Sequence, residues 1–274
     1  MASAGPGGLA VGLSNVSVSL GGRVVFRNAS WEVGVGERAA LAGPSSCGKS
    51  TQLRILLGEQ APDEGRPVFG EGVRCLGVLR RGFLSEVDPG LTVAQALMSA
   101  APRPWGSEVE SLGVVQRPEA EGPGHRSRRP LPEVLQSLGL ADTEDTVVGD
   151  LGPGAAVRVA LGMLAVWRPD VVLLDDPTED LGAEALSELE RVLAAQSCAH
   201  WTLLLASSDR DLMDTLCGKV IDVGDGPATV FTGRYTKYLG SGDRLRFHSF
   251  TLWQPKGSGL RATQAACAFA SLAA

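Results

Sequence analysis

The chain has 274 residues, of which 44% are hydrophobic and 20% are charged, and its formal net charge is −6. This supply of apolar residues is enough for one large or two modest globular domains with a sizeable core. The acidic balance argues against a protein that binds nucleic acid through its overall charge, although a local basic patch stays open.

The first predicted elements form an antiparallel hairpin. Polar and apolar residues alternate in Val16–Leu20, and a second apolar run, Val24–Phe26, follows the pair Gly21 and Gly22. A glycine pair between two such runs is typical of a tight hairpin turn. We expect a third strand near Ser30–Val35.

A glycine-rich loop follows the apolar run Arg38–Ala42 and precedes the helical pattern Gln52–Leu57. It fits G-x-x-x-x-G-K-[ST], in which backbone N–H groups and the start of a helix surround phosphate oxygens. Lys49 is then the cation for the β- and γ-phosphates, and the hydroxyl of Ser50 ligates Mg²⁺. The strand before and the helix after disfavour a chance match. The residues predicted to bind nucleotide are Gly43, Pro44, Ser45, Ser46, Cys47, Gly48, Lys49, Ser50 and Thr51.

The five cysteines are scattered without any C-x-x-C pair or metal-ligand spacing. They predict reduced thiols and a cytoplasmic protein without a zinc site. A helix N-terminus and a neighbouring lysine would lower the pKa of Cys47 and make its thiol oxidisable. The alternative for Cys47, a small residue tolerated in a loop, is the favoured one.

The middle of the chain changes character after a strand near Val73–Leu79 and a short amphipathic helix over Thr92–Ala100. Residues 101–130 are rich in proline and glycine and predict a loop or a disordered insert. The basic run Arg126–Arg129 is expected to be a solvated basic loop, with RNA contact as the alternative. A helix over Leu131–Leu138 follows.

The second half alternates helical patterns with short continuous apolar runs, which is typical of buried parallel strands. One of these runs, Val171–Leu174, leads into the acids Asp175 and Asp176. In phosphate-loop enzymes an acid at a strand end holds Mg²⁺, so Asp175 takes that role, and the next acid orients or deprotonates water. The other predicted elements are helices over Val157–Trp167, Ala183–Leu193 and Asp209–Leu216 and strands over Trp201–Ala206, Lys219–Val223 and Ala228–Phe231.

Three stretches make the chain resemble the ATP-binding cassette superfamily, and within it the soluble, translation-associated F subfamily. They are Asp175–Gly182, Ala206–Leu212 and Val230–Leu239. The resemblance implies an α/β cassette with an N-terminal antiparallel β subdomain, a parallel core sheet and a small helical subdomain. It places a flexible N-terminus at 1–12, the cassette at 13–240, the helical subdomain with the insert at about 92–168, and a tail at 241–274. Only one cassette is present, whereas the subfamily usually carries two.

The same resemblance implies further nucleotide contacts, at which this chain departs from the family pattern. Leu20 stands where the family stacks an aromatic ring on adenine, and the pair Arg80 and Arg81 stands where it has a glutamine. The signature that reaches a partner's nucleotide contains Gly152, Pro153 and Gly154. Gly152 has no hydroxyl and Pro153 has no N–H group. Two donors that the family aims at the opposing triphosphate are therefore missing.

The positions that resemble the family's catalytic residues are altered as well. The resemblance assigns catalytic roles to Lys49, Asp176 and Ser208. Asp176 replaces a glutamate, Ser208 replaces a histidine, and Gly182 replaces an aspartate. A carboxylate that retreats by about 1 Å from the attacking water can cost about a hundredfold in rate.

The resemblance implies an ATP-binding protein of the F type, a weak hydrolase that uses Mg²⁺ and converts nucleotide binding into a change of shape. Its expected partners are a second cassette and, by family alone, the ribosome. Two alternatives stay open: a non-catalytic pseudo-cassette that serves as a scaffold, and the ATPase subunit of a membrane transporter. No apolar run reaches the roughly 18 residues of a membrane span, so none is expected in this chain.

Overall fold

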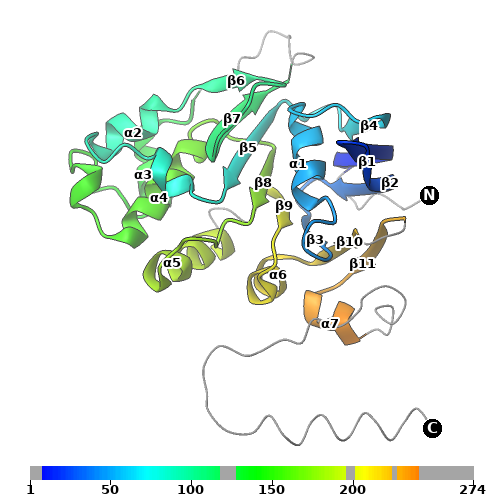
Figure 1. Cartoon of the computed structure of the whole chain (residues 1–274). Helices are drawn as coiled ribbons and strands as arrows, with labels where there is room; N and C mark the ends of the chain where they lie inside the picture. Colours follow the sequence, from blue (N-terminus) through cyan, green and yellow to red (C-terminus); the bar gives the residue numbers. More distant parts are fainter. Residues whose placement is uncertain (1–7, 118–127, 196–200, 224–226, 241–274) are drawn as a thin grey trace, which may run out of the picture.

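The structure is a computed structural model that describes residues 8–117, 128–195, 201–223 and 227–240. Two sheets and a set of helices make up these residues (Figure 1). The expected tail at 241–274, residues 1–7 of the expected N-terminal segment and residues 118–127 of the insert lie outside the described residues. Strand β1 (Leu9–Leu20) begins four residues before the expected cassette boundary.

The smaller sheet is antiparallel, with the order β2 (Arg23–Gly34), β1 and β4 (Glu64–Phe69). Leu20 pairs with Arg23 across the Gly21-Gly22 turn, which confirms the predicted hairpin. The expected third strand is wrong, because Ser30–Val35 belongs largely to β2. Asn28 has a φ of 52°, and the pairing register shifts beside it, so one long strand has the sequence pattern of two.

The larger sheet has a parallel centre. Its order is β11 (Thr229–Thr232), β10 (Lys219–Asp222), β3 (Arg38–Ala42), β9 (Thr202–Ala206), β8 (Val171–Asp175), β5 (Cys75–Arg80), β7 (Leu112–Gln116) and β6 (Pro102–Pro104). All neighbours from β10 to β5 run parallel, β11 and β7 are antiparallel to their inner neighbours, and β6 runs parallel to β7.

The helices cover both faces of this sheet (Figure 1). Helix α1 (Lys49–Leu57) shares one core with the smaller sheet, and most other helices share the core on the opposite face. Side chains alternate along β8: Val171 and Leu173 enter the first core, and Val172 and Leu174 enter the second. The remaining helices are α2 (Val93–Ser99), α3 (Leu131–Ser137), α4 (Pro153–Ala165), α5 (Ala183–Ala194), α6 (Arg210–Leu216) and α7 (Tyr235–Gly240), with 3₁₀ turns at Phe83–Glu86 and Val148–Asp150.

The prediction of a loop or disordered insert over 101–130 is wrong for its first part. Residues 102–104 and 112–116 form β6 and β7, which extend the core sheet beyond β5. The segment between them closes the end of α1: Trp105 Nε1 donates to the carbonyl of Leu56 at 3.0 Å, and the N–H of Gly106 donates to that of Leu57 at 2.9 Å. Two carbonyls that the helix leaves without partners are satisfied in this way.

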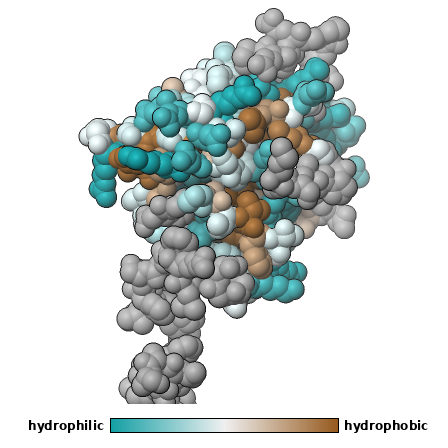
Figure 2. Space-filling view, turned by 90° about the vertical axis from the view of Figure 1, so that its right-hand side faces the viewer, coloured by the Kyte–Doolittle hydropathy of each residue, from teal (hydrophilic) through white to brown (hydrophobic). Residues whose placement is uncertain are grey.

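The smaller sheet lies on the right-hand side of the molecule in Figure 1. Figure 2 is turned so that this side faces the viewer, and it shows hydrophobic side chains at the surface between hydrophilic ones. At the turn of the β1–β2 hairpin, Leu20 and Val24 are 49% and 42% exposed. The inward face of the sheet is fixed to α1 by a hydrogen bond from Trp31 Nε1 to Gln52 Oε1 at 2.7 Å.

Candidate nucleotide-binding site

The glycine-rich loop joins the end of β3 to the start of α1, as the sequence predicts. Gly43 and Gly48 have φ values of 157° and 95°, where a side chain is strained. A Cβ atom on Gly43 would lie 2.7 Å from Cys47 Sγ, and one on Gly48 would lie 2.7 Å from Phe26 Cδ1. The loop is therefore a tight backbone cradle that requires glycine at both ends.

Lys49 is the first residue of α1, and its side chain turns back over the loop. Its ammonium donates hydrogen bonds to the carbonyls of Gly43 at 3.0 Å and Pro44 at 2.9 Å. An ammonium held by carbonyl oxygens at the mouth of a backbone cradle can exchange them for phosphate oxygens, which carry more negative charge. This geometry fits the predicted role of Lys49.

Ser50 and Asp175 meet although they lie far apart in the sequence. The hydroxyl of Ser50 donates to Asp175 Oδ1 at 2.8 Å, where the C-terminal end of β8 reaches the first turn of α1. Burial raises the pKa of the Asp175 carboxyl, and the hydrogen bond from Ser50 opposes that shift. Hydroxyl and carboxylate oxygens are the ligands that Mg²⁺ prefers, so this pair fits the predicted metal site.

Asp176 and Ser208 also come together, but through a backbone group. Asp176 has a φ of 45°, and its N–H donates to the carbonyl of Ala206 at 2.8 Å. Its carboxylate accepts a hydrogen bond from the N–H of Ser208 at 3.2 Å. The second acid is thereby held toward the loop after β9, with one oxygen already engaged.

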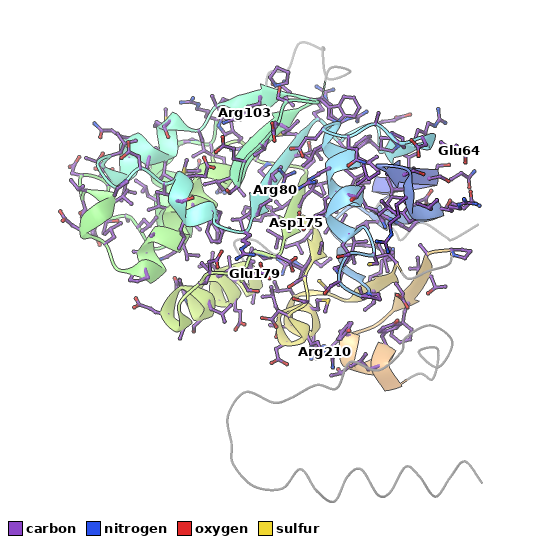
Figure 3. All side chains as sticks on the ribbon, in the orientation of Figure 1. Glu64, Arg80, Arg103, Asp175, Glu179 and Arg210 are labelled. Carbon is purple, nitrogen blue, oxygen red and sulfur yellow. The ribbon has the colours of Figure 1, made fainter. Side chains whose placement is uncertain are left out.

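Two arginines at the end of β5 lie beside these acids, and sequence reasoning assigned neither a contact. Arg80 is paired with Glu59 at 2.6 Å, both side chains being nearly buried, and it also donates to the carbonyl of Val109. Figure 3 shows Arg80 and Glu179 on either side of Asp175 in the middle of the molecule. The guanidinium of Arg81 forms ion pairs with Glu179 and Asp180, both at 2.6 Å.

The signature residues are not part of the phosphate loop and lie elsewhere in the fold. Gly152 is the N-cap of α4 and Pro153 is its first residue, so this helix begins four residues before its predicted start. A Cβ atom on Gly152 would lie 3.3 Å from Glu184 Oε1, and one on Gly154 would lie 3.4 Å from Glu188 Cβ. The start of α4 thus faces two acids of α5. In Figure 1 α4 lies in the left-hand helical part, and α1 lies on the other side of β5 and β8.

Two residues of the hairpin, Val25 and Phe26, reach the phosphate loop, and Leu20 stays a prediction for the position beside adenine. Leu20 lies at the end of β1 and is half-exposed. By contrast, a Cβ atom on Gly48 would meet both Phe26 Cδ1 and Val25 Cγ1 within 3 Å. The apolar run Val24–Phe26 was the available signal, and within it Phe26 is buried in the core beneath the loop.

The environment of Cys47 agrees with the favoured interpretation, a small residue tolerated in a loop, and not with an acidic thiol. Burial is the largest influence and raises the pKa of this thiol, and the charge of Lys49 only partly offsets it. Cys47 is therefore expected to stay a protonated, poorly reactive thiol, in line with the alternative of a small loop residue.

The parallel sheet, the glycine-rich loop and the acid at the adjacent strand end define a class, the phosphate-loop nucleotide-binding proteins. Comparison with models of known protein families identifies one family within this class. The ABC transporter family model matches residues 26–179, more than half of the chain. The chain therefore belongs to the ABC transporter family, the ATP-binding cassette proteins. The predicted cassette fold is confirmed by solved structures.

Curated relatives confirm the resemblance to the F subfamily. The chain is 27% identical to "ABC transporter F family member 2" of Arabidopsis thaliana over 93% of this chain and 40% of that protein. It is also 27% identical to "Energy-dependent translational throttle protein EttA" of Escherichia coli K12 over 82% of this chain and 37% of that protein. The chain thus spans about two fifths of these relatives' length.

Two solved structures share the fold. One is cbiO1 from Clostridium perfringens, part of the ABC transporter complex cbiONQ, with a TM-score of 0.65 and 18% identity over 87% of this chain and 94% of that one. The other is a nucleotide-free ATP-binding cassette from an ABC transporter, with a TM-score of 0.57 and 16% identity over 86% of this chain and 96% of that one. In the ranges that the structure describes, none of the helices combines the length and apolarity of a bilayer span.

Proposed function

We propose that this chain binds Mg·ATP and converts nucleotide binding into a change of shape, with slow hydrolysis. The observation that carries the proposal is the hydrogen bond of 2.8 Å between Ser50 and Asp175, together with the ammonium of Lys49 on the carbonyls of the glycine-rich loop. These residues would hold the metal and the β- and γ-phosphates, and Mg²⁺ would neutralise charge on the phosphates. The backbone of Gly43 to Gly48 would surround the phosphate oxygens.

Slow turnover follows from the residues around Asp176. One oxygen of its carboxylate is engaged by the N–H of Ser208, and the side chain at 208 has no imidazole to meet charge in the transition state. Lys49 and the loop N–H groups bind ground state and transition state more equally, so they favour binding over rate. The same hydrogen bond favours the second candidate function, a pseudo-cassette that binds ATP without hydrolysing it.

The proposed partners are a second cassette and the ribosome. The start of α4, which would face a partner's nucleotide, carries neither a serine hydroxyl at 152 nor an N–H at 153. A complete cassette on another chain or segment would supply what this one lacks. The name of the EttA relative refers to translation, and this supports a ribosomal partner and a cytoplasmic location.

Calorimetry with Mg·ATP on wild-type protein and Lys49→Ala tests the proposal. We expect the substitution to weaken binding at least about tenfold, since it removes a charge-assisted contact to phosphate. Lys237→Ala is the matched control, because Lys237 is an exposed lysine of α7 and not a residue of the phosphate loop. Equal affinity of wild type and Lys49→Ala would contradict the proposal. Phosphate release on the same samples separates a weak hydrolase from a pseudo-cassette.

A further inference from the structure

Arg81 lies directly against the proposed metal-binding acid. Strands β5 and β8 are parallel and place Arg80 opposite Asp175, and the N–H of Arg81 donates to the carbonyl of Asp175 at 3.1 Å. Ser50 bonds the side chain of the same aspartate. The backbone of Asp175 therefore connects Arg81 to the phosphate loop through one residue.

The guanidinium of Arg81 is tied to the loop that follows the two acids. Nε and Nη2 form a fork with the carboxylate of Asp180 at 2.6 and 3.1 Å, and Nη1 pairs with Glu179 at 2.6 Å. The three side chains are exposed, by 60% for Arg81, 59% for Asp180 and 45% for Glu179. Exposed ion pairs are weakened by water and salt, so these contacts can be exchanged for a stronger anion.

The surroundings of Arg81 are acidic. Asp176 acts on the guanidinium as a nearby negative charge, in addition to Asp180 and Glu179. A planar guanidinium recognises phosphate with the same two-pronged geometry that it uses on carboxylate. Because Mg²⁺ held by Ser50 and Asp175 would contact the β- and γ-phosphates, the terminal phosphate would lie on the side of the site where Asp175 adjoins Arg81.

We propose that Arg81 distinguishes a nucleoside triphosphate from a diphosphate, by exchanging Asp180 and Glu179 for the terminal phosphate when the triphosphate binds. This inference rests on the proposed function. It makes Arg81 a specificity-determining residue of the site and makes Asp180 its competitor. Release of Asp180 also frees the loop between β8 and α5, which couples triphosphate binding to that loop.

The test compares the affinities of Mg·ADP and of the magnesium complex of a non-hydrolysable ATP analogue, measured by calorimetry at one salt concentration. Arg81→Gln should lower the preference for the triphosphate analogue about tenfold, the effect of losing one charge-assisted contact. Asp180→Asn removes the competitor and should raise that preference by about twofold or more. Arg81→Lys, which keeps the charge, should restore part of it. If the ion pair between Arg81 and Asp180 had only a structural role, Arg81→Gln and Asp180→Asn would instead change the affinity for both ligands in the same direction.

Arg191→Gln is the matched control. Arg191 is 61% exposed and forms the same kind of fork, with Glu188 at 2.6 and 2.8 Å, away from the phosphate loop on α5. Arg191→Gln should leave the ratio of the affinities for Mg·ADP and for the ATP analogue unchanged. A ratio for Arg81→Gln within twofold of the wild type would overturn this inference while wild-type binding of Mg·ATP sustains the proposed function. No binding of either ligand to the wild type would overturn both.

Discussion

At the scale of single residues, Asp175 shows the conflict between a binding site and a stable fold. Its side chain is partly buried, and burial raises its pKa above the ordinary value of 3.8. A raised pKa means that the charged form costs stability in the folded protein. The charged side chain is well placed to bind a metal ion, and it lowers the stability of the fold when no metal ion is bound.

Asp175→Asn should therefore stabilise the protein without nucleotide and abolish the Mg²⁺ dependence of ATP binding. A stabilisation of about 1 kcal/mol would raise Tm by about 2–4 °C in a domain of this size. Above the raised pKa of Asp175 the charged carboxylate lowers the folding stability by its full amount, and this loss disappears as the pH falls to 3.8. The stabilisation by Asp175→Asn should therefore disappear at acidic pH. Thermal unfolding of both proteins across a pH series measures this. A lower Tm for the variant at pH 7.5 would contradict it.

At the scale of elements, the end of α1 depends on a segment that sequence reasoning took for a loop. The ring of Trp105 packs on Gly58, which ends the helix with a φ of 74°, and a Cβ atom there would lie 2.7 Å from the ring. Trp105 also satisfies a carbonyl of the last turn. The segment between β6 and β7 thus fixes the far end of the helix whose first turn carries Lys49 and Ser50.

Trp105→Ala should lower the free energy of unfolding by about 2–3 kcal/mol. This loss is at or below the low end of the range for a buried tryptophan, because Trp105 is 37% exposed. The substitution should also weaken Mg·ATP binding, since α1 would lose its C-terminal support. Urea unfolding and calorimetry provide the two measurements. Met98→Ala serves as a control, because Met98 is 43% exposed on α2, and we expect it to cost less than about 1 kcal/mol. Equal losses for the two variants would argue against a support role for Trp105.

How far the sequence predicts these elements depends on how local their signals are. The Gly43 to Thr51 loop and the run Val171–Leu174 carry their patterns within a few residues, and both were predicted. Strand β6 contains Pro102 and Pro104, which sequence rules assign to loops, and it is tolerated because it is an edge strand. The start of α4 at Pro153 was missed although proline is favoured at the first helical position.

The contacts at the candidate site also fall into those that the sequence predicts and those that it does not. The residues of the phosphate loop and the acids at the end of β8 follow from their motif, and the meeting of Ser50 with Asp175 follows from a parallel sheet. The fork between Arg81 and Asp180 did not follow, because it joins exposed side chains of two loops whose path depends on the whole fold. The burial that raises the pKa of Cys47 is not visible in the sequence, because Cys47 packs against a core that distant elements build together.

At the scale of the whole molecule, pairing should be unequal. In two copies of this chain both signatures would lack the hydroxyl at 152 and the N–H at 153. We expect ATP to induce little homodimer and a complete cassette from another protein to pair more readily. Light scattering with and without Mg·ATP, alone and with such a cassette, measures this. A stable ATP-dependent homodimer would contradict the expectation.

The position of β3 in the sheet has a consequence for synthesis on the ribosome. This strand, which leads into the phosphate loop, pairs on one edge with β9 (Thr202–Ala206) and on the other with β10 (Lys219–Asp222). Both neighbours leave the ribosome long after β3, so the strand waits without sheet partners while most of the chain is made. Folding that must await such distant pairing is slow and exposes strand edges to aggregation. The nucleotide site can therefore become functional only after the chain has been made past β10, and nascent chains halted earlier should need protection by chaperones.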